Sequence, residues 1–465
     1  MGTRYKGDTM TRVHFVGIFG SGASGVAVAA KRAGFDVSGC DKSENTPYAD
    51  QVRAANIPVA VGHDVSHVRD ADLVVTSTAL TTQHSDTPEI DAARDAGKLI
   101  TWQEFLGRSI FPKYKLIAVC GTHGKTTTTS MLSHVLISAG RDPMAFVGAI
   151  VPEWNSSVHI GKGELAVVEA DEYANNFAPY HPQFIILNNL EMEHPEFFKD
   201  IEHYKKTFID FLAGATPDAT LVYNADWEMA ASVAETFVGE KIPFTMRGVE
   251  IAANADGQDF NPPAPDGYGE SSGFHINLLG EHNVSNAIAV ITMAQRLGVA
   301  DDAIRAALAT FQGAGHRLEK IYDADGVAIY DDYAHHHTQA ARTIAALRAA
   351  RPNDFLIVAY EPHQISRYTQ NTAETLAALN AADATVIIDF WRGREAHLDV
   401  PDVDADIVRF GADRVRYVPD FDAAADWVES LARDKHTGGH AITILVMGAG
   451  KSYKFSHDLK NRLSH

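Results

Sequence analysis

Cysteine and positive charge are both scarce in this chain of 465 residues. It has two cysteines, Cys40 and Cys120, and 40 Lys and Arg residues against 60 Asp and Glu residues, which gives a formal net charge of −20. Each cysteine ends a strand that we expect to be buried, so we expect two reduced thiols rather than a disulfide. The acidic balance argues against a phosphate-backbone partner, and we expect no nucleic-acid binding.

Long apolar runs are also missing. No stretch approaches the roughly 20 consecutive apolar residues of a membrane span, and residues 1–10 have no apolar segment of the kind found in secretion signals. We therefore expect no membrane association and a cytoplasmic location. The apolar share of 45% is ample for several packed cores, and the length favours roughly three domains.

A glycine loop follows an apolar run in the second quarter of the chain. It spans residues 121–127 and reads Gly-Thr-His-Gly-Lys-Thr-Thr. Gly121 and Gly124 allow the backbone to turn its N–H groups inward, and the Thr126 hydroxyl can reach Mg²⁺. Lys125 adds a positive charge that we expect to be exposed. The spacing is not the full Walker A form, but the succession of strand, loop and helix predicts an ATP or GTP site.

A second glycine-rich turn lies between an apolar strand expected at residues 12–18 and a helix expected at residues 26–33. It contains Gly20, Ser21, Gly22, Ser24 and Gly25. A further strand, expected at residues 35–40, leads to Asp41. This βαβ pattern is typical of a dinucleotide site, although any diphosphate at the helix N-terminus satisfies it.

Strands alternate with helices along most of the chain, which predicts an α/β fold. We expect three domains, at residues 1–112, 113–313 and 314–465. Residues 249–273 are poor in aliphatic side chains, and we expect them to form a surface loop.

Seven motifs resemble those of the Mur ligases, the ATP-dependent amide-bond ligases of peptidoglycan precursor synthesis. They stand in the family's order and spacing over nearly the whole chain. They are Gly121–Thr126, Glu169–Glu172, Asn188–His194, Gly280–Asn283, His316–Glu319, Asp331–His336 and Glu361–Arg367.

The resemblance implies a Rossmann-like UDP-binding domain, a central P-loop ATPase-like domain and a C-terminal Rossmann-like domain. Within the family, the motifs are similar to those of the branch that joins L-alanine to the carboxylate of UDP-N-acetylmuramate through an acyl phosphate. The branch that ligates the recycled tripeptide L-alanyl-gamma-D-glutamyl-meso-diaminopimelate is the alternative, and glycine or L-serine as the acceptor also stays open. The implied enzyme is a monomer or a homodimer.

The resemblance also implies roles for individual residues. ATP binding falls on Gly121, Thr122, His123, Gly124, Lys125, Thr126, Thr127, His282, Asn283, Arg317 and Asp332. UDP-sugar binding falls on Gly20, Ser21, Gly22, Ser24, Gly25, Asp41 and His63. Acceptor binding falls on His363 and Arg367, and His336 is a further substrate-binding residue. The Mg²⁺ ligands are Thr126, Glu169 and His194, and the catalytic residues are Lys125, Glu169, His194 and Arg367.

For several of these residues, a purely structural role is the alternative. His194 can form a hydrogen bond behind the metal ligands, and Asp41 and His63 can be a helix-capping carboxylate and a surface histidine. Arg317 and Arg367 can form salt bridges between domains.

Two functions outside ligation also stay open. An NAD-dependent oxidoreductase would use the first glycine turn and Asp41, but it leaves the second loop unexplained. A non-catalytic nucleotide sensor is favoured by Glu193, where the family usually has aspartate, and by His337, where it usually has proline. Gln364 stands where arginine is frequent, which places more of any carboxylate binding on Arg367.

Overall fold

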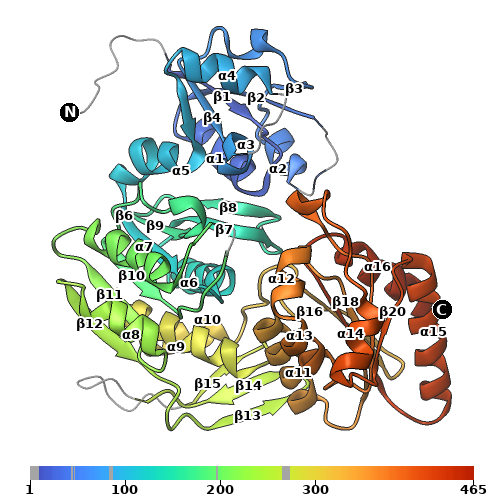
Figure 1. Cartoon of the computed structure of the whole chain (residues 1–465). Helices are drawn as coiled ribbons and strands as arrows, with labels where there is room; N and C mark the ends of the chain where they lie inside the picture. Colours follow the sequence, from blue (N-terminus) through green and yellow to red (C-terminus); the bar gives the residue numbers. More distant parts are fainter. Residues whose placement is uncertain are drawn as a thin grey trace. The chain divides into compact units, whose positions relative to one another are not determined.

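The computed structural model describes residues 10–42, 46, 48–82, 87–194, 197–263 and 273–464. These residues form two compact units, each of which can be followed along the chain in Figure 1. One unit comprises the chain up to Val249 together with Ser285–Phe311, and the other comprises Glu250–Asn261, Gly273–Val284 and the chain from Gln312 onward. Strands alternate with helices in both, so the predicted α/β class is confirmed.

The first unit begins with a five-stranded parallel sheet of order β3-β2-β1-β4-β5. Its strands are β1 (Arg12–Val16), β2 (Asp36–Asp41), β3 (Val59–Val61), β4 (Leu73–Thr76) and β5 (Leu99–Thr101). The connecting helices are α1 (Ser21–Arg32), α2 (Ala49–Ala54), η1 (Val65–Val68), α3 (Thr78–Thr82), α4 (Pro88–Asp95), α5 (Trp102–Phe105), η2 (Leu106–Ile110) and η3 (Phe111–Lys113). The strand order reverses between β1 and β4, which places a ligand crevice at the carboxyl end of β1.

The helix after β1 begins earlier than the sequence predicts. It starts at Ser21 rather than at residue 26, with Gly20 as its N-cap residue. Gly22 and Gly25 therefore lie inside α1, where they permit close packing. A Cβ atom on Gly22 would come within 2.6 Å of the Trp102 ring, and one on Gly25 would lie 3.1 Å from the Ser157 hydroxyl.

The second sheet belongs to the same unit and has seven strands in the order β12-β11-β10-β6-β9-β7-β8. All of its pairs are parallel except β7 with β8. The strands are β6 (Lys115–Cys120), β7 (Met144–Val151), β8 (Ser156–Ile160), β9 (Leu165–Glu169), β10 (Phe184–Leu187), β11 (Thr220–Asn224) and β12 (Glu240–Phe244). The helices are α6 (Lys125–Ser138), η4 (Tyr173–Asn175), α7 (Ile201–Ala213), α8 (Glu228–Glu235), α9 (Glu281–Arg296), most of which belongs to this unit, and α10 (Asp301–Leu308).

A continuous apolar core joins the two sheets of the first unit, from Phe15 on β1 to Phe208 on α7. A polar contact adds to it. The Gln51 side chain donates to the hydroxyls of Ser24 at 2.6 Å and Ser157 at 3.1 Å. The first two predicted domains therefore fold against each other as one unit.

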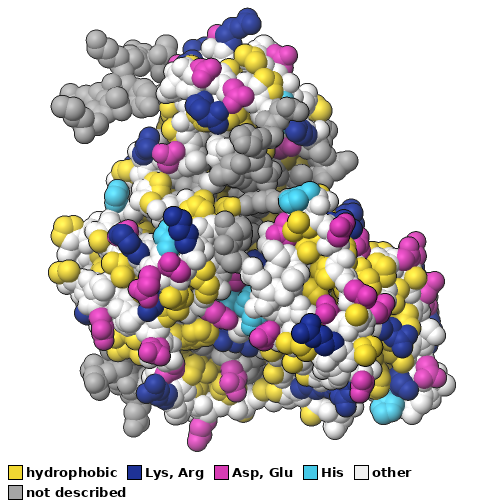
Figure 2. All heavy atoms as spheres, in the orientation of Figure 1, with side chains coloured by type: hydrophobic (Ala, Val, Ile, Leu, Met, Phe, Trp, Pro, Cys, Tyr) yellow, Lys and Arg dark blue, Asp and Glu magenta, His cyan; other side chains and the backbone are white. Residues whose placement is uncertain are grey.

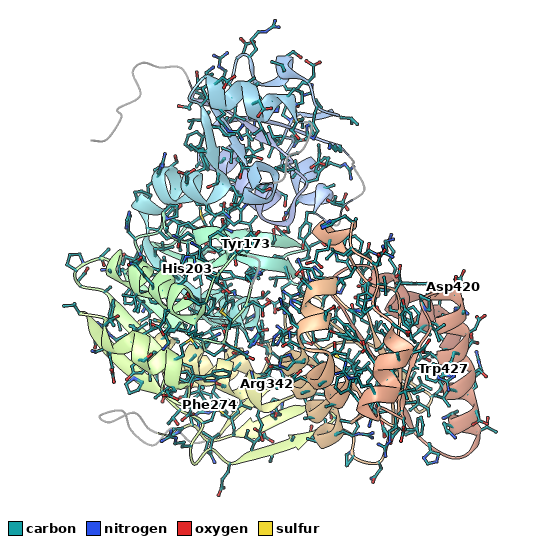
Figure 3. The ribbon with its side chains drawn as sticks, in the orientation of Figure 1. Tyr173, His203, Phe274, Arg342, Asp420 and Trp427 are labelled. Carbon is teal, nitrogen blue, oxygen red and sulfur yellow. The ribbon has the colours of Figure 1, made fainter. Side chains whose placement is uncertain are left out.

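The prediction of a surface loop at residues 249–273 is wrong for its described part. A three-stranded antiparallel sheet contains β13 (Ile251–Asn254), β14 (Gly257–Phe260) and β15 (Phe274–Ile276), and residues 264–272 lie outside the described residues. Phe274, labelled in Figure 3, lies with its ring 6.0 Å from that of Phe260. Strands of three or four residues with so few buried apolar side chains give little sequence signal, because backbone pairing holds them together.

The second unit contains a six-stranded sheet of order β16-β17-β21-β18-β19-β20, in which only β16 and β17 pair antiparallel. The strands are β16 (Glu319–Ala324), β17 (Val327–Asp332), β18 (Phe355–Tyr360), β19 (Ala384–Ile387), β20 (Val415–Tyr417) and β21 (Ile442–Met447). The helices are α11 (His337–Ala350), α12 (Ile365–Gln370), α13 (Thr372–Leu379), η5 (Gly393–Glu395), α14 (Val403–Phe410), α15 (Phe421–Thr437) and α16 (Ser452–Leu463). Two apolar cores, one with α11 and α13 and one with α15 and α16, accompany this sheet.

No helix in the described part of the chain is long and apolar enough to cross a bilayer. On the face drawn in Figure 2, acidic and basic side chains are interspersed, and Lys and Arg form no continuous field there.

Candidate active site

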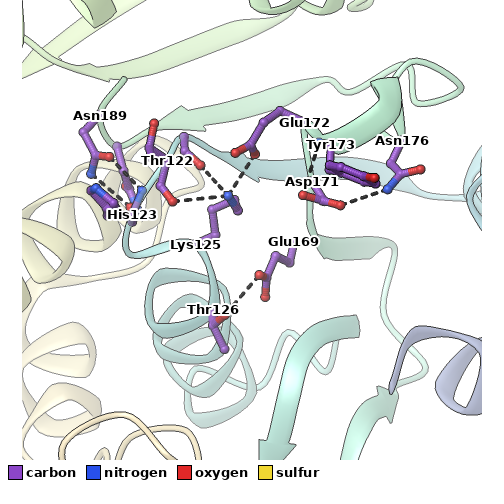
Figure 4. A network of polar contacts seen from close by, with 12 residues as sticks. Thr122, His123, Lys125, Thr126, Glu169, Asp171, Glu172, Tyr173, Asn176 and Asn189 are labelled. Carbon is purple, nitrogen blue, oxygen red and sulfur yellow. Dashed lines mark hydrogen bonds and ion pairs between the residues drawn. The ribbon is translucent and has the colours of Figure 1, made fainter. Parts of the chain in front are cut away.

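The glycine loop joins the carboxyl end of β6 to α6, and Figure 4 shows its polar contacts. Gly121 and Gly124 have φ angles of +129° and +82°, in the region that favours glycine. There is also little space for a side chain at either position. A Cβ atom on Gly121 would lie 2.8 Å from the Asn189 carbonyl oxygen, and one on Gly124 would lie 2.5 Å from Asn286 Oδ1. The loop conformation therefore requires glycine at both positions.

The segment after β10 holds this loop in place. The backbone N–H of Thr122 donates to the Asn189 carbonyl at 3.0 Å, and the N–H of His123 donates to Asn189 Oδ1 at 2.8 Å. The Thr122 hydroxyl bonds with the backbone of Glu191, and His123 Nε2 lies 3.0 Å from Glu191 Oε2. Asn189 and Glu191 thus position the loop, a role that the sequence does not reveal. Their place just after an apolar strand is the signal that could have indicated it.

Lys125 is not the exposed charge that the sequence predicts. Its ammonium donates to the carbonyls of Gly121 and Thr122 at 2.7 and 3.3 Å and to Glu172 Oε2 at 2.8 Å. The Glu172 side chain is 0% exposed and the Lys125 side chain 14%. Burial raises the pKa of Glu172. Although burial also works against the ammonium charge, the carboxylates of Glu172 and Asp171 raise the pKa of Lys125.

Thr126 and Glu169, two of the predicted magnesium ligands, lie together. The Thr126 hydroxyl donates to Glu169 Oε1 at 3.0 Å, and the N–H of Gly148 donates to Glu169 Oε2 at 2.7 Å. Glu169 ends β9 and Thr126 is in the first turn of α6, so the two arrive from neighbouring strand ends. Adjacent hydroxyl and carboxylate oxygens form a donor set that suits Mg²⁺. Thr127, the next residue of α6, is buried.

His194, the third predicted magnesium ligand, lies with a different set of acidic residues. One of its ring nitrogens is within 4.8 Å of carboxylate oxygens of Asp171 and Glu172. The Tyr173 ring meets it edge-on at 4.9 Å. Sequence reasoning gave no role to Asp171, although it stands inside one of the quoted motifs.

Asp41 and His63, the predicted uridine neighbours, both make contacts within the first sheet. Asp41 Oδ2 accepts the N–H of Phe19 at 2.9 Å, so this carboxylate supports the backbone of the first glycine turn. The His63 side chain is only 7% exposed, and its Nδ1 lies 3.2 Å from Glu89 Oε1. The alternative of a surface histidine is therefore wrong.

The predicted acceptor residues lie in the second unit. His363 Nδ1 and Arg367 Nη1 are 2.8 Å apart, and the ring of His335 lies 5.1 Å from that of His363. Arg367 is buried. Burial and the neighbouring Arg367 charge hold the pKa of His335 well below its usual value. Gln364, with a φ angle of +69°, is the N-cap residue of α12.

Asp332 and Arg317 lie at the carboxyl end of β17 and on the segment before β16. The Asp332 carboxylate accepts the backbone N–H groups of Leu318 at 2.6 Å and Ala334 at 2.7 Å. Burial raises the pKa of Asp332 to about 6. The Arg317 guanidinium stands over the Tyr333 ring at 4.9 Å.

The remaining predicted contacts are also in the second unit. The Asn283 side chain donates to the Leu279 carbonyl at 2.9 Å. His282 packs over Gly280, where a Cβ atom would lie 2.5 Å from the imidazole. His336 caps α11 by accepting an N–H of its first turn at 3.4 Å.

We expect Lys125→Met to lower the free energy of unfolding by about 3 kcal/mol, because loss of one partner leaves a buried charge uncompensated. Urea denaturation without nucleotide measures this. The double variant Lys125→Met/Glu172→Gln should recover most of the loss. Lys206→Met, which removes the exposed pair with Asp210, should cost under about 0.5 kcal/mol. A single variant as stable as wild type would contradict the importance of the buried pair.

Models of three parts of one family match this chain. The Mur ligase family catalytic domain matches residues 12–110, the Mur ligase middle domain matches residues 119–294, and the Mur ligase glutamate ligase domain matches residues 316–450.

Curated relatives and solved structures match over nearly the whole length. A UDP-N-acetylmuramate–L-alanine ligase of Rubrobacter xylanophilus is 33% identical over 97% of this chain and 100% of its own, and one of a Nocardioides species is 34% identical over 95% and 94%. The fold is similar to that of the UDP-N-acetylmuramate-alanine ligase of Thermotoga maritima, with a TM-score of 0.79 at 24% identity over 97% of this chain and 99% of that one. It is also similar to the fold of a murein peptide ligase of Psychrobacter arcticus, with a TM-score of 0.70 at 23% identity over 98% of this chain and 99% of that one. The chain therefore belongs to the Mur ligase family.

Proposed function

We propose that this chain is an ATP-dependent ligase that joins L-alanine to the carboxylate of UDP-N-acetylmuramate. The observation that carries this proposal is the full-length similarity to curated ligases named for that reaction, at 33–34% identity. The glycine loop with Lys125 and the Thr126–Glu169 pair supply the site that such a ligase needs.

The reaction requires an activated carboxylate, because its oxygen does not leave at neutral pH. Transfer of the γ-phosphoryl group of ATP gives an acyl phosphate, and the amino group of L-alanine then displaces phosphate. Three anionic groups meet during this transfer, and the site must offset their repulsion.

The glycine loop and Lys125 would hold the ATP phosphates. The ammonium has three N–H groups, and in the structure they point to two carbonyls and to Glu172. A phosphate oxygen would replace one of the carbonyl contacts while the ion pair with Glu172 keeps the side chain in position. His282, Asn283, Arg317 and Asp332 are the second unit's candidates for the adenine, the ribose and the phosphates.

The donor atoms near the loop fit Mg²⁺. Thr126 and Glu169 would bind one cation, which neutralises phosphate charge when bound. The group of Asp171, Glu172 and His194 would suit a second cation, since two of its members are carboxylates.

The two substrates would bind elsewhere on the chain. Gly20 is the N-cap residue of α1 and Ser21–Gly25 are its first residues, where the helix end would stabilise a diphosphate. Arg367, with His363 beside it, would hold the L-alanine carboxylate through its bidentate fork.

Phosphate release tests the proposed reaction. Wild-type enzyme with ATP, Mg²⁺ and UDP-N-acetylmuramate should release phosphate at least about tenfold faster with L-alanine than with the free tripeptide, because an acceptor pocket discriminates by differential binding. Faster turnover of the tripeptide would show the recycling activity instead. If neither acceptor leads to phosphate release, a non-catalytic nucleotide sensor is favoured.

A change at Glu169 tests the magnesium site. Glu169→Gln should raise the half-saturating Mg²⁺ concentration by about tenfold, because an anionic ligand becomes neutral at constant shape. The measurement is initial rate against Mg²⁺ at fixed ATP. Glu164→Gln, an exposed position that pairs with Lys115, is the control. Equal half-saturating Mg²⁺ concentrations for the two variants would show that Glu169 is not a metal ligand.

A change at Arg367 tests the acceptor site. Arg367→Lys keeps the charge but loses the fork, so the KM for L-alanine should rise at least about tenfold while those for ATP and the UDP-sugar change little. Arg409→Lys, at an exposed position on α14, controls for general effects. Thermal melting of both variants separates binding from folding. An equal rise in KM for all three substrates would contradict the assignment of Arg367 to the L-alanine carboxylate.

A further inference from the structure

A cluster of side chains that ligate metals lies in the first sheet, apart from the residues given to ATP. It contains His14 on β1, Cys40 on β2, His63 after β3, His67 on η1 and Glu89 on α4. His14 pairs in register with Ser38, two residues before Cys40, so His14 and Cys40 project from the same face of the sheet. The topology thus brings side chains from five segments into two overlapping groups, one of His14, Cys40 and His67 and one of Cys40, His63 and Glu89.

The spacing of the Cys40, His63 and Glu89 ligand atoms matches three corners of a tetrahedral site. Cys40 Sγ lies 3.6 Å from His63 Nδ1 and 3.4 Å from Glu89 Oε1. Glu89 Oε1 is in turn 3.2 Å from His63 Nδ1 and 3.2 Å from His67 Nδ1. Zinc bonds of about 2.0 Å to nitrogen or oxygen and about 2.3 Å to sulfur place neighbouring ligand atoms about 3.3–3.6 Å apart in a tetrahedron.

Hydrogen bonds alone do not explain these contacts. Glu89 Oε1 also accepts the backbone N–H of Asp64 at 2.7 Å, so four groups approach one oxygen atom. A carboxylate oxygen offers about two lone pairs. Meanwhile the other oxygen, Glu89 Oε2, is buried without a partner among the described residues. A cation resolves the crowding, because Oε1 then binds it and accepts only the Asp64 N–H.

The burial of the cluster adds an electrostatic requirement. The Glu89 side chain is 0% exposed, and its ion-pair partners within the described residues are His63 and His67 alone. A buried carboxylate needs compensating charge. His14 Nε2 is also buried without a partner in the described chain.

We propose that Cys40, His63 and Glu89 bind one thiophilic divalent cation such as Zn²⁺, that His67, which contacts Glu89, completes the donor set, and that His14 lies beside them. A donor set of sulfur, two imidazoles and one carboxylate selects Zn²⁺ over Mg²⁺. The spacing of the two histidines, with three residues between them, is typical of zinc sites. His63 then binds metal rather than uridine.

The cation would fasten three separate segments of the first sheet to one another. It joins the end of β2, the segment after β3 and the beginning of α4. Asp41, which supports the first glycine turn, directly follows Cys40. The site therefore braces this edge of the sheet, and it does so whether or not the proposed ligase activity is correct.

Cobalt substitution tests the site on the full chain without a histidine tag. Chelator-treated protein titrated with Co²⁺ in excess Mg²⁺ should bind one equivalent and develop a thiolate-to-cobalt charge-transfer band. Cys40→Ser should abolish the band and weaken Zn²⁺ binding at least about 100-fold, because a ligand is lost. Cys120→Ser, which changes the other buried cysteine on β6, should keep both. Circular dichroism verifies that each variant is folded.

A second variant covers the case in which Cys40→Ser does not fold. The His67 side chain is 21% exposed, so His67→Gln disturbs packing less and should weaken Zn²⁺ binding at least about tenfold while retaining the thiolate band. Three results would each overturn the proposal: no band in the wild-type protein, an unchanged band in folded Cys40→Ser, or loss of the band in Cys120→Ser. Unchanged Zn²⁺ affinity in His67→Gln would do the same.

Discussion

The ion pair between Lys125 and Glu172 joins the start of α6 to the segment after β9, and the glycine loop depends on it. The same ammonium holds the carbonyls of Gly121 and Thr122, so one side chain fixes the loop backbone and the neighbouring strand end together. A lysine held in this way is already oriented when a phosphate arrives. The entropy of ordering the side chain is then spent in folding rather than in binding.

This arrangement also leaves the site with little positive charge of its own. Glu172 neutralises the loop lysine, and Glu169, Asp171 and Glu191 lie on the adjoining strand ends. A protein surface of this kind repels a nucleotide unless cations accompany it. Under the proposed function, cations must therefore accompany the nucleotide phosphates, in keeping with the overall excess of acidic residues.

Much of this molecule was predictable from its sequence, for reasons that particular residues illustrate. The run Lys115–Cys120 is continuous and apolar, so its strand was clear, and Gly121 and Gly124 are needed by backbone geometry that leaves few alternatives. The pairing of Thr126 with Glu169 was predictable because both belong to motifs that resemble those of the family, in the family's order.

The roles of Asn189 and Glu191 were not predictable, because hydrogen bonds to a loop 66–68 residues away leave no local pattern. The strands β13 and β14 were missed because they bury few apolar residues. The cluster around Glu89 was missed because its members lie up to 75 positions apart in the sequence and meet only after the sheet forms.

The apolar core shared by the first two sheets has a consequence for how this chain can be divided. Phe111 precedes the expected boundary at residue 112, yet its ring lies 5.7 Å from that of Phe146 and 5.1 Å from that of Tyr180, both beyond it. A fragment ending at that boundary would place these aromatic contacts in water, at a cost of several kcal/mol for side chains of this size. A recombination event at residue 112 would therefore need a partner that already carries the matching aromatic surface.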